Sequence, residues 1–183
     1  MDNKQWIEIK TDWFYHKSES RAQFCIEKQN SEHGLSWVFR VRVNKKALLH
    51  PTTMSSNTYY EGLWEYDVAE WFIADPATGK YIELNLAPTG AWWMMVFNSL
   101  RQRAEQFMPD LKKISADSVL NDDSWSAFLE IPIAVLQEIF GSVALKHNVC
   151  FILGHNPREY LSWTRLDSKH PDFHRPADFL FTL

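Results

Sequence analysis

Four carboxylates lie in the middle of the chain, among residues that are otherwise largely apolar. Asp67 and Glu70 lie in the stretch LWEYDVAEWFIAD, which Asp75 ends, and Glu83 follows in YIELNL. Two neighbouring carboxyl groups can act as acid and base in the hydrolysis of a glycosidic bond. Asp67 and Glu70, however, are three residues apart in a predicted strand, so their side chains point to opposite faces. We therefore predict no catalytic pair and no enzyme, and the sequence lacks the common catalytic motifs.

Histidines of the late segment KHPDFHR could bind a metal ion. His170 and His174 are four residues apart, with Asp172 between them. Pro171 argues against the helix that would align the two histidines on one face. Hydrogen-bonded histidines are the simpler interpretation, so we predict no metal site there.

Calcium and haem are the other candidate cofactors. Asp75 or the acidic run 121–123 could hold calcium, but the spacing of an EF-hand is absent. Met94 and Met95 with His155 could be imagined as haem ligands, although methionines in an aromatic strand usually fill the core. We predict no cofactor. A structural calcium ion is an alternative that no motif in the sequence supports.

Aromatic side chains are the unusual feature of the composition: 9 Trp, 6 Tyr and 12 Phe among 183 residues. Trp64 follows a long polar connection, and Phe173 lies in a late loop. If the two loops meet, their rings could clamp a flat ligand, with Glu70, Asn85 and Arg158 supplying hydrogen bonds. A sugar suits such a site, because its C–H faces stack on rings while its hydroxyls need donors and acceptors. Judged by spacing alone, Trp64 and Phe173 are better explained as hydrophobic side chains that close the two ends of the sandwich.

Alternating apolar residues predict many short strands. The chain also contains one helix pattern that Pro132 opens and Gly141 closes, and a second short helix is expected over 99–108. The strands are expected over 6–10, 23–29, 35–43, two arms around the turn 75–79, 91–98, 124–131, 148–155, 159–165 and 179–183. This pattern predicts an all-β fold, a two-sheet antiparallel β-sandwich with one or two short helices.

Length and charge limit the remaining possibilities. A chain of 183 residues with a net charge of −4 is most simply one domain, residues 1–183, without a basic surface for nucleic acid. Cys25 and Cys150 form no metal-binding spacing and are expected to be buried thiols. The N-terminus lacks the pattern of a signal peptide and no apolar run could span a membrane, so we expect a cytoplasmic protein.

Five stretches in order carry a family resemblance: LWEYDVAEWFIAD, YIELNLAPTG, SWSAFLEIPIAVL, YLSW and PDFHRPADFLFTL. Together they resemble the family 9 carbohydrate-binding modules and their DOMON-like relatives. The closest likeness is to small, stand-alone bacterial DOMON-like proteins, which have a similar NxxPxG-Trp stretch before an arginine-containing segment, here Phe97 to Arg103. The resemblance spans about residues 63–183 and implies a β-sandwich that binds without catalysis.

The resemblance also implies roles for particular residues. In sugar-binding members two aromatic rings sandwich a terminal sugar, and these rings correspond to Trp64 and Phe173, while the strand glutamate of the family corresponds to Glu70. Three positions depart from the pattern: Phe173 replaces a tryptophan, Asn85 lies near an expected arginine, and His170 lies near an expected asparagine. Phenylalanine offers less stacking area, and losing the arginine removes a strong donor.

The sequence therefore predicts a non-catalytic module for a saccharide or similar polyol, stacked between Trp64 and Phe173. Glu70 and Asn85 are the expected hydrogen-bonding residues, and Arg158 and Trp163 are second-rank candidates. Trp163 lies inside a predicted strand, and the core is its favoured place. Two alternatives stay open: a haem-binding DOMON-like redox domain, and a protein-interaction module, whose partner the sequence does not reveal.

Overall fold

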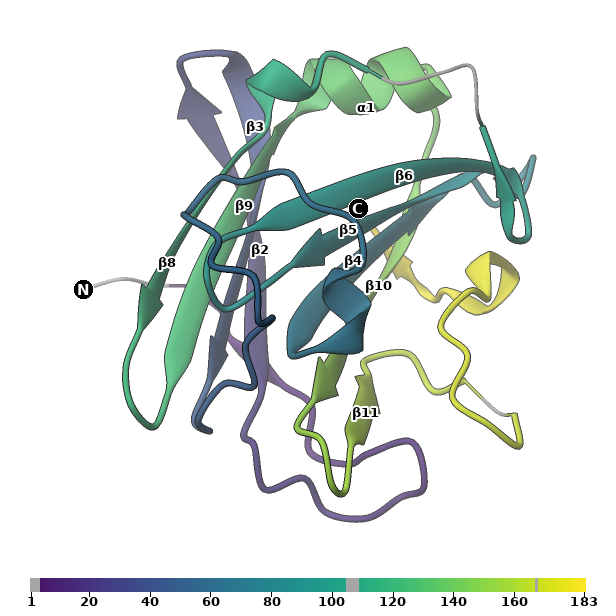
Figure 1. Cartoon of the computed structure of the whole chain (residues 1–183). Helices are drawn as coiled ribbons and strands as arrows, with labels where there is room; N and C mark the ends of the chain where they lie inside the picture. The colour runs from purple at the N-terminus through teal and green to yellow at the C-terminus, as the bar shows by residue number, and fades with distance from the viewer. Residues whose placement is uncertain (1–3, 105–108, 167) are drawn as a thin grey trace.

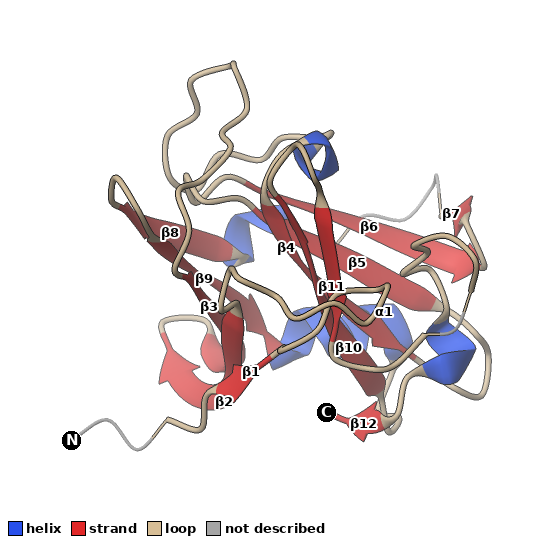
Figure 2. Ribbon diagram, turned by 90° about the horizontal axis from the view of Figure 1, so that it is seen from below, coloured by secondary structure: helices blue, strands red, loops and turns tan. Residues whose placement is uncertain are grey.

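The fold consists of two antiparallel sheets packed face to face, with a helix across one end (Figure 1). A computed structural model of the chain describes residues 4–104, 109–166 and 168–183. Figure 2 shows the same two layers from below, with β8, β9, β3, β2 and β1 in one and β6, β5, β4, β10 and β11 in the other. The predicted β-sandwich is thereby confirmed.

Over the described residues, the first sheet has five strands. In spatial order they are β1 (Ile7–Glu8), β2 (Gln23–Ser31), β3 (Gly34–Val43), β9 (Trp125–Pro132) and β8 (Ser115–Leu120). The second sheet, counted in the same way, has seven strands. They are β11 (Glu159–Ser162), β10 (Lys146–Leu153), β4 (Val68–Ala74), β5 (Tyr81–Leu86), β6 (Trp92–Ser99) and β7 (Gln102–Arg103), with β12 (Phe181–Thr182) beside β10.

The described helical segments are few and short. The α-helix α1 (Ile133–Phe140) runs from Pro132 to Gly141, as predicted. Three 3-10 turns are η1 (Leu63–Glu65), η2 (Leu111–Lys113) and η3 (Pro176–Asp178). Among the described residues, no helix is long and apolar enough to cross a membrane.

The main core lies between the two sheets and follows from the period-two alternation of the strands. On β5, Ile82, Leu84 and Leu86 are buried in this core, as the sequence predicts. The larger side chains there include Trp71 of β4, whose ring lies 5.5 Å from that of Phe39 on β3. The seven-stranded sheet therefore turns one whole face of its strands towards its partner.

The opposite face of the seven-stranded sheet is covered as well. A second cluster of buried apolar side chains lies there, and Phe173 and Phe179 of the C-terminal segment belong to it. Glu70, Glu83 and Asn85 project from β4 and β5 on this same face. Since residues 63–65 and the C-terminal segment pack over it, this outer face carries buried polar groups beside aromatic rings (Figure 1).

Two predictions about elements are wrong. The helix expected over 99–108 does not form in its described part, residues 99–104, where β6 ends at Ser99 and turns into β7; residues 105–108 lie outside the described chain. The strand β8 was not expected, because its residues alternate weakly; it forms because it pairs with β9 from Ser115 to Leu120. Tertiary pairing decided both segments against their local pattern.

Trp71 provides a test of the core. Its side chain is fully buried, and its indole N–H donates a hydrogen bond to Nδ1 of His147 at 3.2 Å. Trp71→Ala removes this packing and leaves His147 without its partner, so we expect a loss of about 3–5 kcal/mol in the free energy of unfolding. Chemical denaturation followed by circular dichroism measures it.

The matched control is Val119→Ala on β8, where the side chain is 60% exposed. It should change the free energy of unfolding by no more than about 0.5 kcal/mol. Equal, small losses for both variants would contradict the assignment of Trp71 to the core.

Candidate ligand-binding cleft

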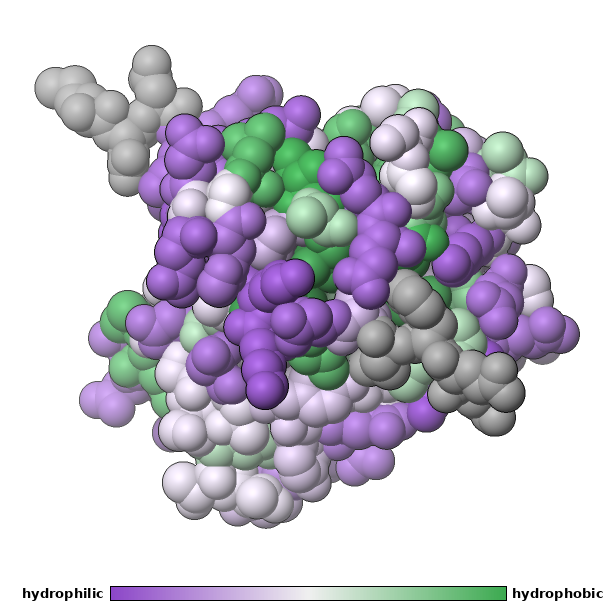
Figure 3. Space-filling model, turned by 90° about the horizontal axis from the view of Figure 1, so that it is seen from above, coloured by the Kyte–Doolittle hydropathy of each residue, from purple (hydrophilic) through white to green (hydrophobic). Residues whose placement is uncertain are grey.

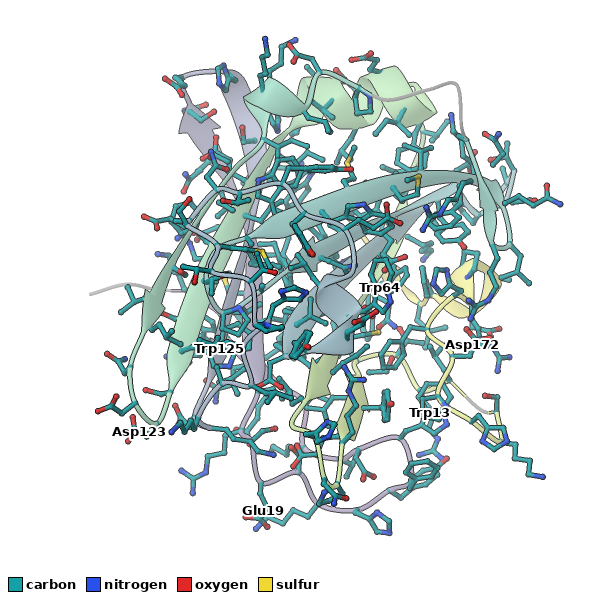
Figure 4. The ribbon with its side chains drawn as sticks, viewed as in Figure 1. Trp13, Glu19, Trp64, Asp123, Trp125 and Asp172 are labelled. Atoms are coloured by element: carbon teal, nitrogen blue, oxygen red, sulfur yellow. The ribbon has the colours of Figure 1, made fainter. Side chains whose placement is uncertain are left out.

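A cleft of about 400 Å³ lies on the outer face of the seven-stranded sheet. Its walls come from η1, from strands β4, β5, β6, β10 and β11, from the β6–β7 hairpin, and from the C-terminal segment. Figure 4 shows Trp64 of η1 and Asp172 of the C-terminal segment on this same side of the sheet. The lining residues are Trp64, Glu70, Glu83, Trp93, Phe97, Arg101, Arg103, Ile152, Tyr160, Pro171, Asp172, Phe173 and His174.

Two carboxyl groups lie on the sheet at the bottom of the cleft. Glu70 of β4 is 3% exposed and Glu83 of β5 is 5% exposed. The amide nitrogen of Asn85 donates to Oε1 of Glu83 at 3.0 Å, while Oδ1 of Asn85 is buried without a partner among the described residues. No described residue donates a hydrogen bond to Glu70. Within the described part of the chain, the Glu70 carboxyl is thus left open to a donor from the cleft.

Burial dominates the electrostatics of these two acids. It raises the pKa of Glu70 well above its usual 4.5, and the neighbouring Glu83 raises it further, against a weaker opposing effect of Arg158. Burial also raises the pKa of Glu83 to about 7, although the hydrogen bond from Asn85 and the arginines 101 and 103 oppose the change. The cleft therefore contains two acids whose pKa values are raised by burial, and that of Glu83 is about 7.

His174 links the wall of the cleft to Glu83. Its Nε2 lies 3.5 Å from Oε2 of Glu83, and its Nδ1 lies 2.8 Å from the hydroxyl of Tyr81. Burial lowers the pKa of His174 to about 4, and the charge of Arg101 lowers it further. Near neutral pH the ring is uncharged, so it can exchange hydrogen bonds with Glu83 but does not neutralise it.

Two arginines from the β6–β7 turn form the mouth of the cleft. Arg101 has a φ of 58°, a conformation that non-glycine residues seldom adopt. Its backbone N–H donates to the Tyr81 hydroxyl at 3.0 Å, and its guanidinium donates to Asp172 at 2.7 Å. Arg103 donates to Glu61 at 2.7 Å, over the ring of Trp93. Both arginines are thus held in place by acids.

Trp64 is partly exposed and forms an aromatic wall. Its ring lies 5.2 Å from that of Trp93, at an interplanar angle of 61°. Arg158 fixes the backbone of η1, because its guanidinium donates to the carbonyl oxygens of Trp64 and Tyr66 at 2.5 and 3.2 Å. Arg158 is therefore a positioning residue for Trp64, set behind the cleft.

Phe173 lines the cleft but is itself 6% exposed. Its ring packs against Trp13 at 5.6 Å and against Tyr160 at 6.4 Å, centroid to centroid. The structure therefore brings Trp64, Glu70 and Phe173 to one cleft. Little of the Phe173 ring is free, so the partly exposed Trp64 offers the better stacking surface.

The other site residues expected from the sequence lie outside the lining. Asn85 is fully buried behind Glu83, and Arg158 acts on the backbone of η1. Trp163 lies at the main core, stacked on Phe181 with ring centroids 3.3 Å apart. The structure therefore does not bring Trp163 to the cleft, and its place at the core agrees with the favoured interpretation.

The remaining acids serve the backbone. Asp67 accepts hydrogen bonds from the N–H groups of Leu48 and Gly154, at 3.0 and 2.6 Å. Asp75 accepts bonds from the Ala77 N–H and the Thr78 hydroxyl within its turn, and the latter contact lowers its pKa. Both carboxylates thus hold loops.

The residues considered for metals and haem are separated in space. His170 is exposed whereas His174 is in the cleft wall; Met94 is buried in the main core whereas Met95 packs on the outer face. His155 is exposed beside the β10–β11 turn. Over the described residues, no group of three or more His, Cys, Asp or Glu side chains is arranged to hold a metal ion.

Sequence reasoning missed several lining residues. Glu83 was considered for a carboxylate pair but was not assigned to the binding site, yet its place beside Glu70 follows from the pairing of Glu70 with Asn85 across β4 and β5. Arg101 and Arg103 were placed in a predicted helix, which hid the turn that carries them. Alternation along β6 would have put Trp93 and Phe97 on the same face as Glu83 once that register was known.

Comparisons with known proteins give structural relatives only. No family model matches the sequence, and no curated protein matches it significantly. A candidate carbohydrate-binding protein from Bacteroides uniformis ATCC 8492 superposes with a TM-score of 0.73 at 16% identity, covering 97% of this chain and 85% of its own. Two structures of a family 9 carbohydrate-binding module from Caldicellulosiruptor kristjanssonii are also similar.

The complex of that module with glucose has a TM-score of 0.56 at 9% identity, covering 88% of this chain and 74% of its own. The complex with cellotriose has a TM-score of 0.59 at 10% identity, covering 97% and 80%. At these identities the likeness establishes the fold. This chain has the β-sandwich of family 9 carbohydrate-binding modules, as the sequence resemblance implied.

The raised pKa of Glu83 predicts a pH-dependent stability. Unfolded chains ionise glutamate near 4.5 and the folded protein ionises Glu83 near 7, so folding retains a proton in between. The contribution of Glu83 to stability is therefore lost as the pH rises through this window. Glu83→Gln keeps the shape without the ionisation, so we expect it to be more stable than the wild type at pH 8, by on the order of 2 kcal/mol, and to differ less at pH 5. Denaturation at both pH values measures it.

The test compares variants with the wild type at each pH, because two buried histidines change the stability of every variant with pH in the opposite direction to Glu83. Burial lowers the pKa of His147 and His174 to about 4, which adds stability as the pH rises from 4 to 6.5. The control is Glu138→Gln on the exposed side of α1. If Glu83→Gln and Glu138→Gln differ from the wild type equally at both pH values, the burial of an ionisable Glu83 is wrong.

Proposed function

We propose that this protein is a non-catalytic carbohydrate-binding module and that its cleft holds a saccharide. One observation carries the proposal: Glu70, a buried carboxyl without a hydrogen-bond partner among the described residues, shares a cleft with the partly exposed ring of Trp64. A sugar presents apolar C–H faces to a ring and hydroxyl donors to a carboxylate. The volume of about 400 Å³ lies within the range of small-ligand sites.

The fold supports this proposal. Relatives with the same sandwich were solved with glucose and with cellotriose. We propose that Trp64 forms the stacking wall, that Glu70 and Glu83 accept hydroxyl protons, and that Phe173 closes the far side. Arg158 and Asn85 act behind the cleft by fixing Trp64 and Glu83.

The interaction-module alternative needs a broad exposed apolar patch. On the face seen in Figure 3, apolar side chains show in gaps between hydrophilic ones, and they do not form one wide surface. The cleft, which combines charged groups with aromatic rings, favours a small polar ligand. We also propose that the protein is found in the cytoplasm and needs no cofactor.

Trp64→Ala tests the stacking wall. Tryptophan fluorescence and calorimetric titration against mono- and oligosaccharides should give saturable binding for the wild type, and at least about a tenfold loss of affinity for the variant because one sugar face is no longer covered. The matched control is Trp6→Ala, whose ring faces Arg42 on the five-stranded sheet. A folded wild type that binds no saccharide, or equal binding by both variants, would contradict the proposal.

Catalysis is the competing function, because two carboxyls share the cleft. A hydrolase should release reducing sugar from oligosaccharides and lose that activity in Glu70→Gln. We expect no release by the wild type over hours at pH 5 to 8. Release that Glu70→Gln abolishes would make the protein an enzyme.

A further inference from the structure

Glu70 and Glu83, which form the floor of the cleft, are not matched by positive charges of their own. The arginines at the mouth each already have an acidic partner, in the pairs Arg101–Asp172 and Arg103–Glu61. Glu70 and Glu83 have no comparable ion pair with an arginine or lysine among the described residues. Two acids are therefore left over on the sheet, at the closed end of the cleft.

A third cation, Arg158, is close enough to Glu70 to oppose the rise in its pKa. Its guanidinium hydrogen bonds, however, go to the carbonyl oxygens of Trp64 and Tyr66. The Glu70 carboxyl is 3% exposed, lines the cleft and receives no hydrogen bond from any described residue. A buried group of this kind is costly unless something outside the protein completes it.

A neutral sugar does not account for the second acid. One carboxylate beside amide groups accepts sugar hydroxyls well, whereas two adjacent buried carboxyls raise each other's pKa and oppose ionisation. A positive charge on the ligand removes this penalty, because it lowers the pKa of both acids together. The partly exposed ring of Trp64 in the wall also favours a cation over a neutral group.

We propose that the preferred ligand is an amino sugar, a saccharide with a free, protonated amine, whose ammonium group binds between Glu70 and Glu83. This inference rests on the proposed saccharide-binding function and names the ligand class for that site. The sugar ring lies against Trp64, and the arginines at the mouth stay paired with their acids. Acylation of the amine removes its charge and adds bulk at the floor, so acylated amino sugars bind less well.

Binding of the ammonium requires the floor to be ionised, so it weakens at low pH. The groups that face Glu70 and Glu83 come from every neighbouring element: the β6–β7 turn, the C-terminal segment, the β10–β11 turn and the loop before η1. They are Arg101, Arg103, Asp172, His174, Arg158 and Glu61, together with two groups of the sheet itself, Cys150 of β10 and Tyr81 of β5. Of these, His174 has a pKa of about 4 and stays neutral over the pH range of the test.

Calorimetric titration tests the proposal with four probes at pH 7 and pH 5: glucose, glucosamine, 6-amino-6-deoxyglucose and N-acetylglucosamine. For the wild type at pH 7, we expect at least one of the two free amines to bind roughly tenfold or more tightly than glucose, and N-acetylglucosamine to lose that advantage. At pH 5 the preference for the amine should shrink, because a protonated carboxyl group no longer attracts the ammonium.

Glu83→Gln should abolish the preference for the amine, whereas Glu138→Gln on the exposed side of α1 should keep both that preference and glucose binding. Glu70→Gln is the second variant, expected to lose the same preference, and the comparison of probes on the wild type needs no variant. Equal affinity for glucose and both amines, or a preference that survives Glu83→Gln, overturns the amino-sugar assignment and leaves the saccharide function standing. If no probe and no saccharide binds the folded wild type, both proposals fail.

Discussion

The burial of two carboxyl groups on a covered sheet face is the constraint on which the rest of the site depends. Glu70 and Glu83 project from neighbouring strands on the face opposite the main core, under a roof of aromatic side chains. An ionised carboxylate in such surroundings needs hydrogen bonds or opposite charge. Asn85 and His174 serve Glu83, while Glu70 is left facing the cleft.

The neighbouring structure follows from this arrangement. The aromatic side chains that cover the two acids come partly from the C-terminal segment, whose Phe173 and Phe179 belong to the second apolar cluster. The wall formed by Trp64 depends on the position of η1. Arg158 fixes that position by donating hydrogen bonds to the carbonyl oxygens of Trp64 and Tyr66. Fixed loops and packed rings keep the cleft open without a ligand, so binding need not order the backbone first.

The fold could be predicted from the sequence because alternation is a strong local signal. Ile82, Leu84 and Leu86 revealed the core face of β5, and Pro132 with Gly141 marked α1. The strand β8 and the β6–β7 turn were not predictable, since pairing with β9 and β6 decides them. Arg101 and Arg103 were missed for the same reason. In the predicted helix their side chains would not have been expected at the cleft, whereas the β6–β7 turn brings them there.

The sequence could point to site residues that stand out by their type. It could not point to those whose place depends on the register between strands. Trp64, Glu70 and Phe173 were candidates from the residues themselves and received their roles from the family resemblance, and the structure brings all three to the cleft. Asn85 was assigned to the ligand, although its buried amide instead supports Glu83. Arg158 looked like a ligand donor but holds backbone, and Trp163 packs at the core. Side-chain direction beyond the alternation pattern depends on tertiary contacts that spacing does not contain.

The most direct test of this account is a carbon-13 NMR titration of the glutamate carboxyl groups, with Glu70→Gln and Glu83→Gln used to assign the two resonances. Glu83 should titrate near pH 7 and Glu70 above its usual value of 4.5, and added saccharide should shift these two resonances. If both groups titrate near 4.5 and stay unmoved by every sugar tested, the floor of the cleft is not a buried acidic binding site and the account is contradicted.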